Sequence, residues 1–151
     1  MSSAEAGVTL IEITCALAIL SILAAILLPL VPRETSRSRL EAYALEAAAL
    51  LKADRAAAIR THTLVATRID ATGASIFSGA SRRAVSVPND MVFDALLPES
   101  CNERPAFSTI SFFSNGMSCG GTIALTKRGI GYEIRVNWLT GGVDIVPRAA
   151  L

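Results

Sequence analysis

The sequence predicts an α+β protein, in which a long N-terminal helix, with a transmembrane half and an amphipathic half, packs on an antiparallel β-sheet or sandwich. Three observations carry this prediction. An apolar run fills residues 8–31, a segment rich in Ala, Leu and Glu continues to residue 60, and short β-like segments between turn formers make up the remainder. With 151 residues, 52% of them apolar, the chain suits one modest core plus one extra element.

The apolar run is long enough to be a membrane helix. About 24 residues rising ~1.5 Å each reach about 36 Å, against a hydrocarbon core of ~30 Å. The favourable insertion free energy of its Val, Leu and Ile residues outweighs the cost of inserting one acid, Glu12, which is ~3 kcal/mol. A cleaved secretory signal is the competing interpretation. Its apolar region is shorter, follows basic residues and ends in small ones, whereas Pro29-Leu30-Val31-Pro32 ends this run.

Two features disagree about the side of the membrane on which the C-terminal part lies. Arg33, Arg37 and Arg39 follow the apolar run and no Lys or Arg precedes it, which favours the cytoplasm under the positive-inside rule. Cys101 and Cys119 lie among turn formers, and a disulfide between them would imply an oxidising compartment; two unpaired thiols are the alternative. Such a bridge closes a loop of about 19 residues and contributes ~3 kcal/mol.

Residues 34–60 are predicted to form an amphipathic helix that packs on a sheet, because Ala, Leu and Glu are good helix formers. Asp54 intrudes on the apolar face, whereas Glu41, Lys52 and Arg60 point elsewhere. We interpret the apolar stripe as domain core rather than as a partner site. Its members at helical spacing are Leu40, Tyr43, Ala44, Ala47, Leu51 and Ala58.

From His62 onward, short segments of β character are separated by Gly, Pro, Asn and Ser. The clearest strand is Tyr132 to Trp138, because apolar and polar residues alternate there without a miss. Thr140-Gly141-Gly142 supplies a turn into Val143, which predicts a terminal hairpin. The expected strands are residues 64–70, 75–77, 84–87, 91–93, 108–113, 122–126, 132–138 and 143–146.

No catalytic site is predicted. Gly116-Met117-Ser118-Cys119-Gly120 fits the G-x-S-x-G pattern of serine hydrolases, but that motif requires a helix after it. Here the following residues indicate a turn into another strand, so the glycines are interpreted as turn formers. The one histidine, His62, is expected at the surface or at a strand edge.

No metal, cofactor or small-molecule substrate is expected either. The cysteines have no C-x-x-C partners, and one histidine is insufficient for a zinc site. The acidic pairs Asp90 with Asp94 and Glu99 with Glu103 lack the Gly-centred loop of a calcium hand. A net charge of +1 with scattered arginines argues against nucleic acid as the main partner.

The stretch Gly7-Val8-Thr9-Leu10-Ile11-Glu12 resembles the N-terminus of type IV pilins and of the pseudopilins of type II secretion. That family pattern is a short polar leader ending in Gly, then an aromatic or aliphatic residue, Thr-Leu-Ile-Glu and a long apolar helix. Pro29 falls where many pilins carry a proline inside this helix. The match is specific, because an acid at that offset into a membrane helix is rare on physical grounds.

The resemblance implies that a prepilin peptidase cuts between Gly7 and Val8 and methylates the new Val8 amine. The resulting ammonium, on the same subunit or on a neighbour, makes a buried Glu12 carboxylate tolerable, so we expect Glu12 to act in filament assembly. The implied organisation is a leader over residues 1–7, a transmembrane and filament-core helix over 8–31, an amphipathic helix over 32–61 and a periplasmic β-rich domain over 62–151. The protein would sit in the inner membrane with a single pass.

Three further stretches narrow the resemblance to H-type minor pseudopilins and related minor pilins: residues 58–60, residues 113–125 and Thr140 to Val143. The implied function is a structural subunit of the pseudopilus, near its tip, with other minor pseudopilins, the major pseudopilin and membrane lipid as partners. Loops 79–89 and 98–105 are candidate contacts. Two alternatives stay open: a minor type IV pilus subunit, for pilus assembly or DNA uptake, and a single-pass anchored periplasmic enzyme or binding module.

Overall fold

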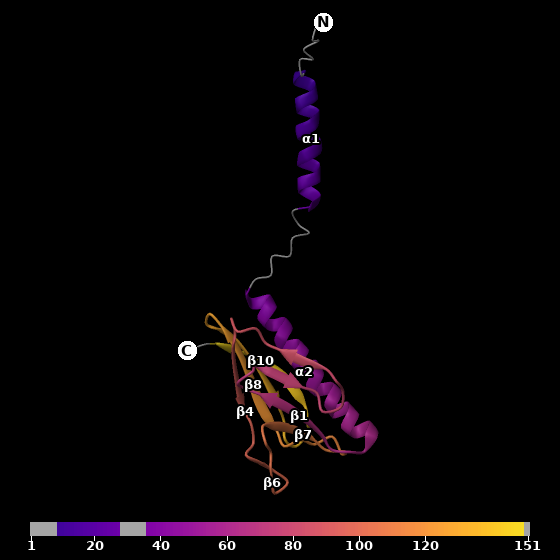
Figure 1. Cartoon of the computed structure of the whole chain (residues 1–151), viewed down its shortest axis with the longest axis vertical. Coiled ribbons are helices and arrows are strands. Elements are labelled where there is room, and N and C mark those ends of the chain that lie inside the picture. The colour runs from indigo at the N-terminus through magenta and orange to yellow at the C-terminus, as the bar shows by residue number, and fades with distance from the viewer. Residues whose placement is uncertain (1–8, 28–35, 150–151) are drawn as a thin grey trace, which may run out of the picture. The chain divides into compact units, whose positions relative to one another are not determined.

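The computed structural model describes residues 9–27 and 36–149, which fall into two compact units on either side of residue 34 (Figure 1). The first unit holds helix α1 (Leu10–Leu27), and the second holds helix α2 (Ser36–Thr61) with all the strands. The expected leader, Gly7, Val8 and Pro29 lie outside the described residues. Their predicted roles stay predictions.

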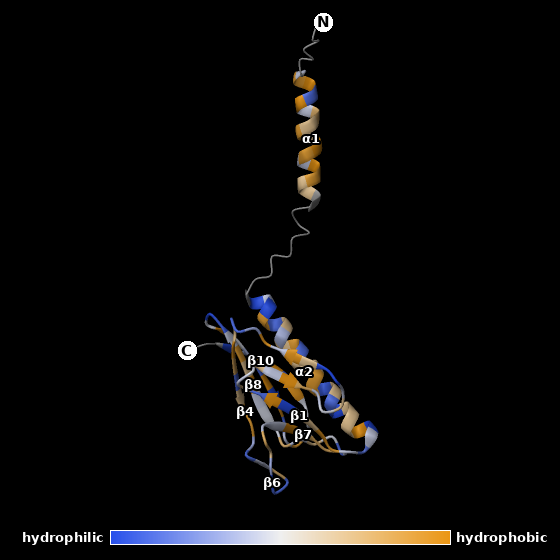
Figure 2. Cartoon of the chain, viewed as in Figure 1, coloured by the Kyte–Doolittle hydropathy of each residue, from blue (hydrophilic) through white to orange (hydrophobic). Residues whose placement is uncertain are grey.

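Apolar residues predominate on every side of helix α1, which also contains Glu12 in its first turn and the hydroxyl residues Thr14 and Ser21 (Figure 2). Its polar hydroxyls are satisfied within the helix itself. Thr14 Oγ1 donates to the carbonyl of Ile11 at 2.8 Å, and Ser21 Oγ donates to that of Leu17 at 2.8 Å. No helix within residues 9–27 and 36–149 has both the length and the apolar character required to cross a membrane. The predicted span over 8–31 extends past α1 at both ends and stays a prediction.

Helix α2 buries the predicted stripe against the sheets, which confirms that interpretation. The apolar positions at helical spacing are buried, and Tyr43 is half-buried. The buried face is wider than predicted, because it also includes Ala48, Leu50 and Ala57. Asp54, which interrupts the apolar pattern, lies on this face with 1% of its surface exposed.

The strands form two antiparallel four-stranded sheets and a small hairpin, as expected for an α+β chain (Figure 1). The first sheet has the order β3 (Ala84–Ser86), β2 (Ser75–Phe77), β1 (Val65–Asp70), β7 (Thr109–Phe112). The second has the order β10 (Val143–Ala149), β9 (Ile130–Val136), β8 (Gly121–Lys127), β4 (Val92–Leu96). The hairpin pairs β5 (Ser100–Cys101) with β6 (Arg104–Pro105).

One core joins α2 to both sheets. Alternate residues of β1 point inward, so that Val65 and Ile69 are buried while Arg68 is exposed. Phe112 from the first sheet and Leu125 from the second are both 0% exposed in the same cluster as the apolar face of α2. Burial of this apolar surface is the main stabilising contribution to the second unit.

Most predicted strands differ from the observed ones by one to three residues at an end, and two of these differences have a clear local reason. The strand predicted to end at Trp138 ends at Val136, because the side chain of Asn137 accepts hydrogen bonds from the amides of Leu139 and Thr140 and so begins the turn early. The strand predicted to begin at Met91 begins one residue later, since the Met91 amide donates to the carbonyl of Pro88 in a turn. The terminal hairpin itself is confirmed, with Val143 opposite Val136.

The β5–β6 hairpin was not predicted. Its two loop residues, Asn102 and Glu103, both have positive φ values, 52° and 62°. A two-residue hairpin loop requires this conformation, which Asn-Gly or Asp-Gly signals and Asn-Glu does not. The hairpin therefore lacks the usual sequence signature.

Candidate functional site

Glu12 occupies the first turn of α1, where its amide donates to the carbonyl of Thr9 at 3.0 Å. A negative charge is favourable there, because the first turn carries the positive end of the helix dipole. Within the part of the chain that the structure describes, the carboxylate makes no hydrogen bond or ion pair. The expected partner, the Val8 amine, lies outside the described residues, so the pairing stays a prediction.

The apolar side chains of α1 are uncovered within their own unit. Leu10 is 84% exposed, Ile11 71% and Leu20 61%, and these residues point in different directions around the helix. A helix that is apolar on all sides needs an apolar surrounding, either lipid or the helices of other chains. This exposed helix with its single acid is the candidate functional site of the first unit.

In the second unit, Asp54 is the buried centre of a polar cluster. Its carboxylate accepts hydrogen bonds from Thr67 Oγ1 at 2.6 Å and from Ser78 Oγ at 2.5 Å. It also accepts from the amide of Gly79 at 2.9 Å and from that of Ala80 at 3.4 Å. Helix α2 is thus tied to β1 and to the turn between β2 and β3. Asp54, which interrupts the apolar pattern of the sequence, therefore has hydrogen-bond partners for its carboxylate and anchors α2 to the sheet.

The next residue, Arg55, connects α2 to two other turns, one before β8 and one before β10. Its Nε donates to the carbonyl of Gly116 at 2.9 Å, and one terminal nitrogen donates to the carbonyl of Thr140 at 2.9 Å. These turns contain the 113–116 and 140–143 stretches that carry the family resemblance. Their backbones meet closely, since a Cβ added to Gly141 would lie 2.0 Å from the Gly116 oxygen.

Replacing Gly141 with alanine is expected to destabilise the second unit strongly. Gly141 has φ +63°, and the added Cβ would push the Gly116 turn away from Arg55. Gly129→Ala is the matched control, because Gly129 has φ +80° but open space around it. We expect roughly 1–2 kcal/mol for the control and roughly 3 kcal/mol or more for Gly141→Ala in thermal unfolding of the full chain in detergent. Equal losses would contradict the contact.

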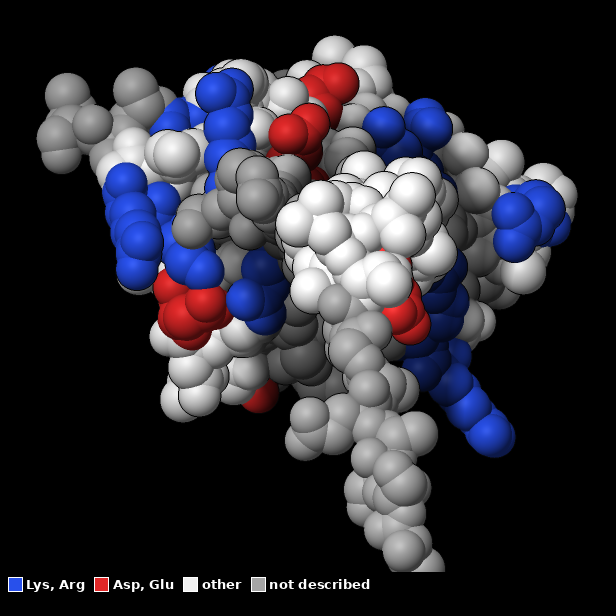
Figure 3. All heavy atoms as spheres, turned by 90° about the horizontal axis from the view of Figure 1, so that it is seen from above, with Lys and Arg blue, Asp and Glu red and all other residues white. Residues whose placement is uncertain are grey.

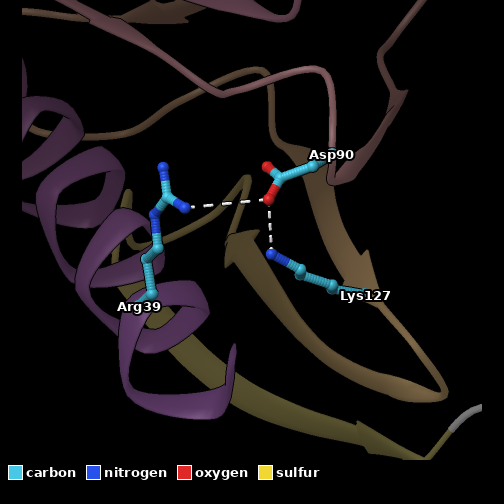
Figure 4. A network of polar contacts seen from close by, with 3 residues as sticks. All are labelled: Arg39, Asp90 and Lys127. Atoms are coloured by element: carbon cyan, nitrogen blue, oxygen red, sulfur yellow. Dashed lines mark hydrogen bonds and ion pairs between the residues drawn. The ribbon is translucent and has the colours of Figure 1, made fainter. Parts of the chain in front are cut away.

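A second polar network lies near the N-terminal end of α2 (Figure 4). Asp90 accepts a hydrogen bond from Lys127 Nζ at 2.5 Å and faces an Arg39 guanidinium nitrogen at 3.7 Å. The Lys127 hydrogen bond lowers the pKa of Asp90, and the charges of Lys127 and Arg39 act in the same direction. Ionised Asp90 therefore stabilises the folded state above the ordinary pKa of Asp, and this stabilisation is lost as the pH falls through the lowered pKa of Asp90. Solvent exposure keeps that contribution small.

Cys101 and Cys119 are joined in the structure, with their Cα atoms 5.6 Å apart, which confirms the predicted disulfide. The bond ties the β5–β6 hairpin to the segment that connects the two sheets. The Cys119 amide in turn donates to the carbonyl of Ser111 on β7 at 3.1 Å. The hairpin is therefore fastened to the sheet by a covalent bond. The third cysteine, Cys15, is a free thiol on α1.

Replacing both Cys101 and Cys119 with serine is expected to cost ~3 kcal/mol of stability, since the bridge closes a loop with a sequence separation of 18. Wild-type protein in excess reductant should unfold at the same temperature as the double variant. Cys15→Ser is the control and should leave unfolding of the second unit unchanged. A melting curve of the double variant that matches oxidised wild type would contradict the structural role of the bridge.

The G-x-S-x-G stretch has no nucleophile geometry. Ser118 is buried, its hydroxyl donates to the carbonyl of Ser111 at 2.8 Å and accepts from the Gly120 amide, and strand β8 follows rather than a helix. His62 is exposed at the end of α2, as predicted. Among the residues that the structure describes, no group of three or more His, Cys, Asp or Glu residues is arranged to hold a metal ion.

Charged residues of both signs are interspersed on the face shown in Figure 3. Lys and Arg side chains stand beside Asp and Glu rather than in a single basic patch on that face. Among the described residues on the face shown, Lys and Arg therefore form no continuous track for a phosphate backbone.

Known proteins resemble this chain both in its N-terminal segment and in its fold. Residues 2–28 match the prokaryotic N-terminal methylation motif. The fold resembles the type IV minor pilin FimU of Pseudomonas aeruginosa, with TM-score 0.57, 18% identity, and coverage of 76% of this chain and 95% of that one. It also resembles the minor pseudopilin EpsH of the Vibrio cholerae type II secretion system, with TM-score 0.60, 13% identity, and coverage of 78% and 100%. No curated protein matches the sequence.

The fold is therefore type IV pilin-like, with a helix packed on antiparallel sheets, and the N-terminal residues of the chain carry the methylation motif. This confirms the resemblance read from the opening residues. Within that class, the fold is similar to one minor pilin and to one minor pseudopilin to nearly the same degree.

Proposed function

We propose that this chain is a minor pseudopilin of a type II secretion system, a structural subunit of the periplasmic pseudopilus near its tip. The observation that carries the proposal is α1, a helix that is apolar all round, has one acid in its first turn and starts inside the methylation motif. Such a helix is stable in lipid and can also pack among identical or related helices. The chain is therefore suited to move from membrane to filament.

The proposed maturation follows from the motif. A prepilin peptidase cuts between Gly7 and Val8 and methylates the Val8 amine, while residues 8–31 hold the precursor in the inner membrane. The β-rich domain lies in the periplasm, where the Cys101–Cys119 bond is stable. The membrane holds the subunit until other minor and major pseudopilins take it up.

Mass spectrometry of the protein isolated from its host membranes tests the maturation. The expected mature chain begins at an N-methylated Val8. A chain that still begins at Met1, in cells that contain the peptidase, contradicts the proposal and favours a single-pass anchored binding module or enzyme.

The second candidate is a minor subunit of a type IV pilus, which the likeness to FimU favours. Deletion of the gene distinguishes the two functions. Loss of protein export with pili intact supports the pseudopilin, whereas loss of pili or of DNA uptake with export intact supports the pilin.

A further inference from the structure

The two large sheets have four edge strands, and three of these are blocked against pairing with another chain. Strand β3 has only three residues, and β10 contains Pro147. The outer side of β7 is covered by residues 118 and 119, through the Phe112–Ser118 bridge and the hydrogen bond from Cys119 to Ser111.

Strand β4 is the exception. It pairs with β8 on one side, and its five residues contain no proline, lysine or arginine (Figure 1). Alternate side chains point outward, with Val92 64% exposed and Leu96 77% exposed on either side of Asp94. Natural sheets avoid a free edge that presents large apolar side chains, because such an edge recruits another strand.

Asp94 supplies charge at the centre of this edge. It is exposed and, among the residues described, makes no hydrogen bond or ion pair. Across the sheet it stands in one row with Ala124 and Glu133, and Glu133 is already paired with Arg135 at 2.9 Å. The hollow of about 340 Å³ on this face of the sheet lies on the paired side of β4, over Thr122, Ala124, Glu133 and Arg148. Arg148 lines that hollow without forming an ion pair with Asp94. The carboxylate therefore stays available to a cationic side chain of a strand added at the free edge.

A second copy of this chain does not fit the edge. Antiparallel pairing of two β4 strands that uses all five residues places Asp94 opposite its own equivalent, and directly opposed like charges destabilise a strand pair. The complementary partner is a different chain, with a Lys or Arg between two apolar residues at alternate positions.

We propose that β4 is a docking edge that receives an extended segment of another subunit of the same filament, with a basic side chain against Asp94 and apolar side chains against Val92 and Leu96. Backbone hydrogen bonds of the added strand supply affinity, and the side-chain pattern supplies selectivity. The choice of a filament subunit as the partner rests on the proposed function.

The test uses the full-length chain, co-expressed with the other minor subunits and the major subunit encoded by the same host, and solubilised in detergent. Hydrogen–deuterium exchange is measured for the chain alone and in the co-purified complex. We expect the amides of β4 to exchange about tenfold more slowly in the complex. Asp94→Lys should weaken the complex about tenfold, because it sets like charges opposite each other.

Asp144→Lys is the matched control. Asp144 is an exposed acid on the same face of the same sheet, at the opposite edge on β10, and the control variant should bind normally. Asp94→Lys should melt like the wild type, because Asp94 is exposed and stands opposite Ala124, whereas Asp144→Lys should melt somewhat lower, because Asp144 stands opposite Arg135. Binding is therefore compared at a temperature at which both variants are folded. If the subunits bind and β4 exchanges as fast as in the free chain, the docking edge is wrong and the proposed function stands. If no subunit binds, the proposed function and the docking edge both fall.

Discussion

Glu12→Ala is expected to leave membrane insertion and cleavage largely intact and to reduce incorporation into the filament by roughly tenfold or more. Removing the acid makes the helix more apolar, so insertion does not suffer. What is lost is a charged hydrogen-bonded pair with the Val8 ammonium of the same or a neighbouring subunit, and such a pair is worth ~1.5–3 kcal/mol. A loss of about 1.4 kcal/mol is already tenfold in an equilibrium constant.

The measurement is a co-assembly assay that compares the amount of the variant in sheared filaments with the amount in membranes. Thr14→Ala and Ser21→Ala are matched controls, because they remove polar groups from the same helix that bond only to their own backbone, at 2.8 Å each. Both should assemble normally. Normal incorporation of Glu12→Ala would mean that the acid has no part in assembly.

Asp54→Ala is expected to be the most destabilising single substitution in the second unit. It leaves the hydroxyls of Thr67 and Ser78 and the amide of Gly79 without their acceptor. The buried Thr67 hydroxyl left unsatisfied costs ~1–3 kcal/mol, and the lost hydrogen bonds from the less buried Ser78 and Gly79 cost ~1 kcal/mol each, so the total is roughly 3–5 kcal/mol. At about 4 °C for each kcal/mol, the melting temperature should fall by roughly 12–20 °C.

Circular dichroism of the full chain in detergent measures this fall. Thr67→Val is the graded comparison, because it removes one donor while leaving the carboxylate with its other partners; it should cost ~1–2 kcal/mol. Asp70→Ala is the control, since Asp70 is exposed and its carboxylate accepts a hydrogen bond from the Gly73 amide in its own turn. If Asp54→Ala melts like the control, the cluster does not anchor α2.

The parts of the fold that follow from local pattern were predictable. The spacing of Leu40, Ala44 and Leu51 determines which face of α2 is buried, and strict alternation identifies the strand that begins near Tyr132. The disulfide was predictable because turn formers surround both cysteines. Glu12 was identified by its offset into an apolar helix, which is itself a local feature.

The parts that depend on distant partners were not predictable. The donors to Asp54 lie 13 to 26 residues further along the chain, so a lone acid on an apolar face looks like an interruption. Arg55 bonds to carbonyls 61 and 85 residues away, on turns whose approach depends on the complete fold. The open edge at β4 likewise follows only from the strand order, which brings together β4 and β8 across a gap in sequence that contains the disulfide hairpin.

Adjacent residues of α2 reach opposite parts of the domain, and this has a mechanical consequence. Asp54 is bonded to β1 and the β2–β3 turn, whereas Arg55 is bonded to the turns that precede β8 and β10. A pull on the N-terminal end of α2 is therefore divided between the two sheets at one point of the helix. Neither sheet peels away first, and rupture under tension should be a single event rather than a stepwise extension.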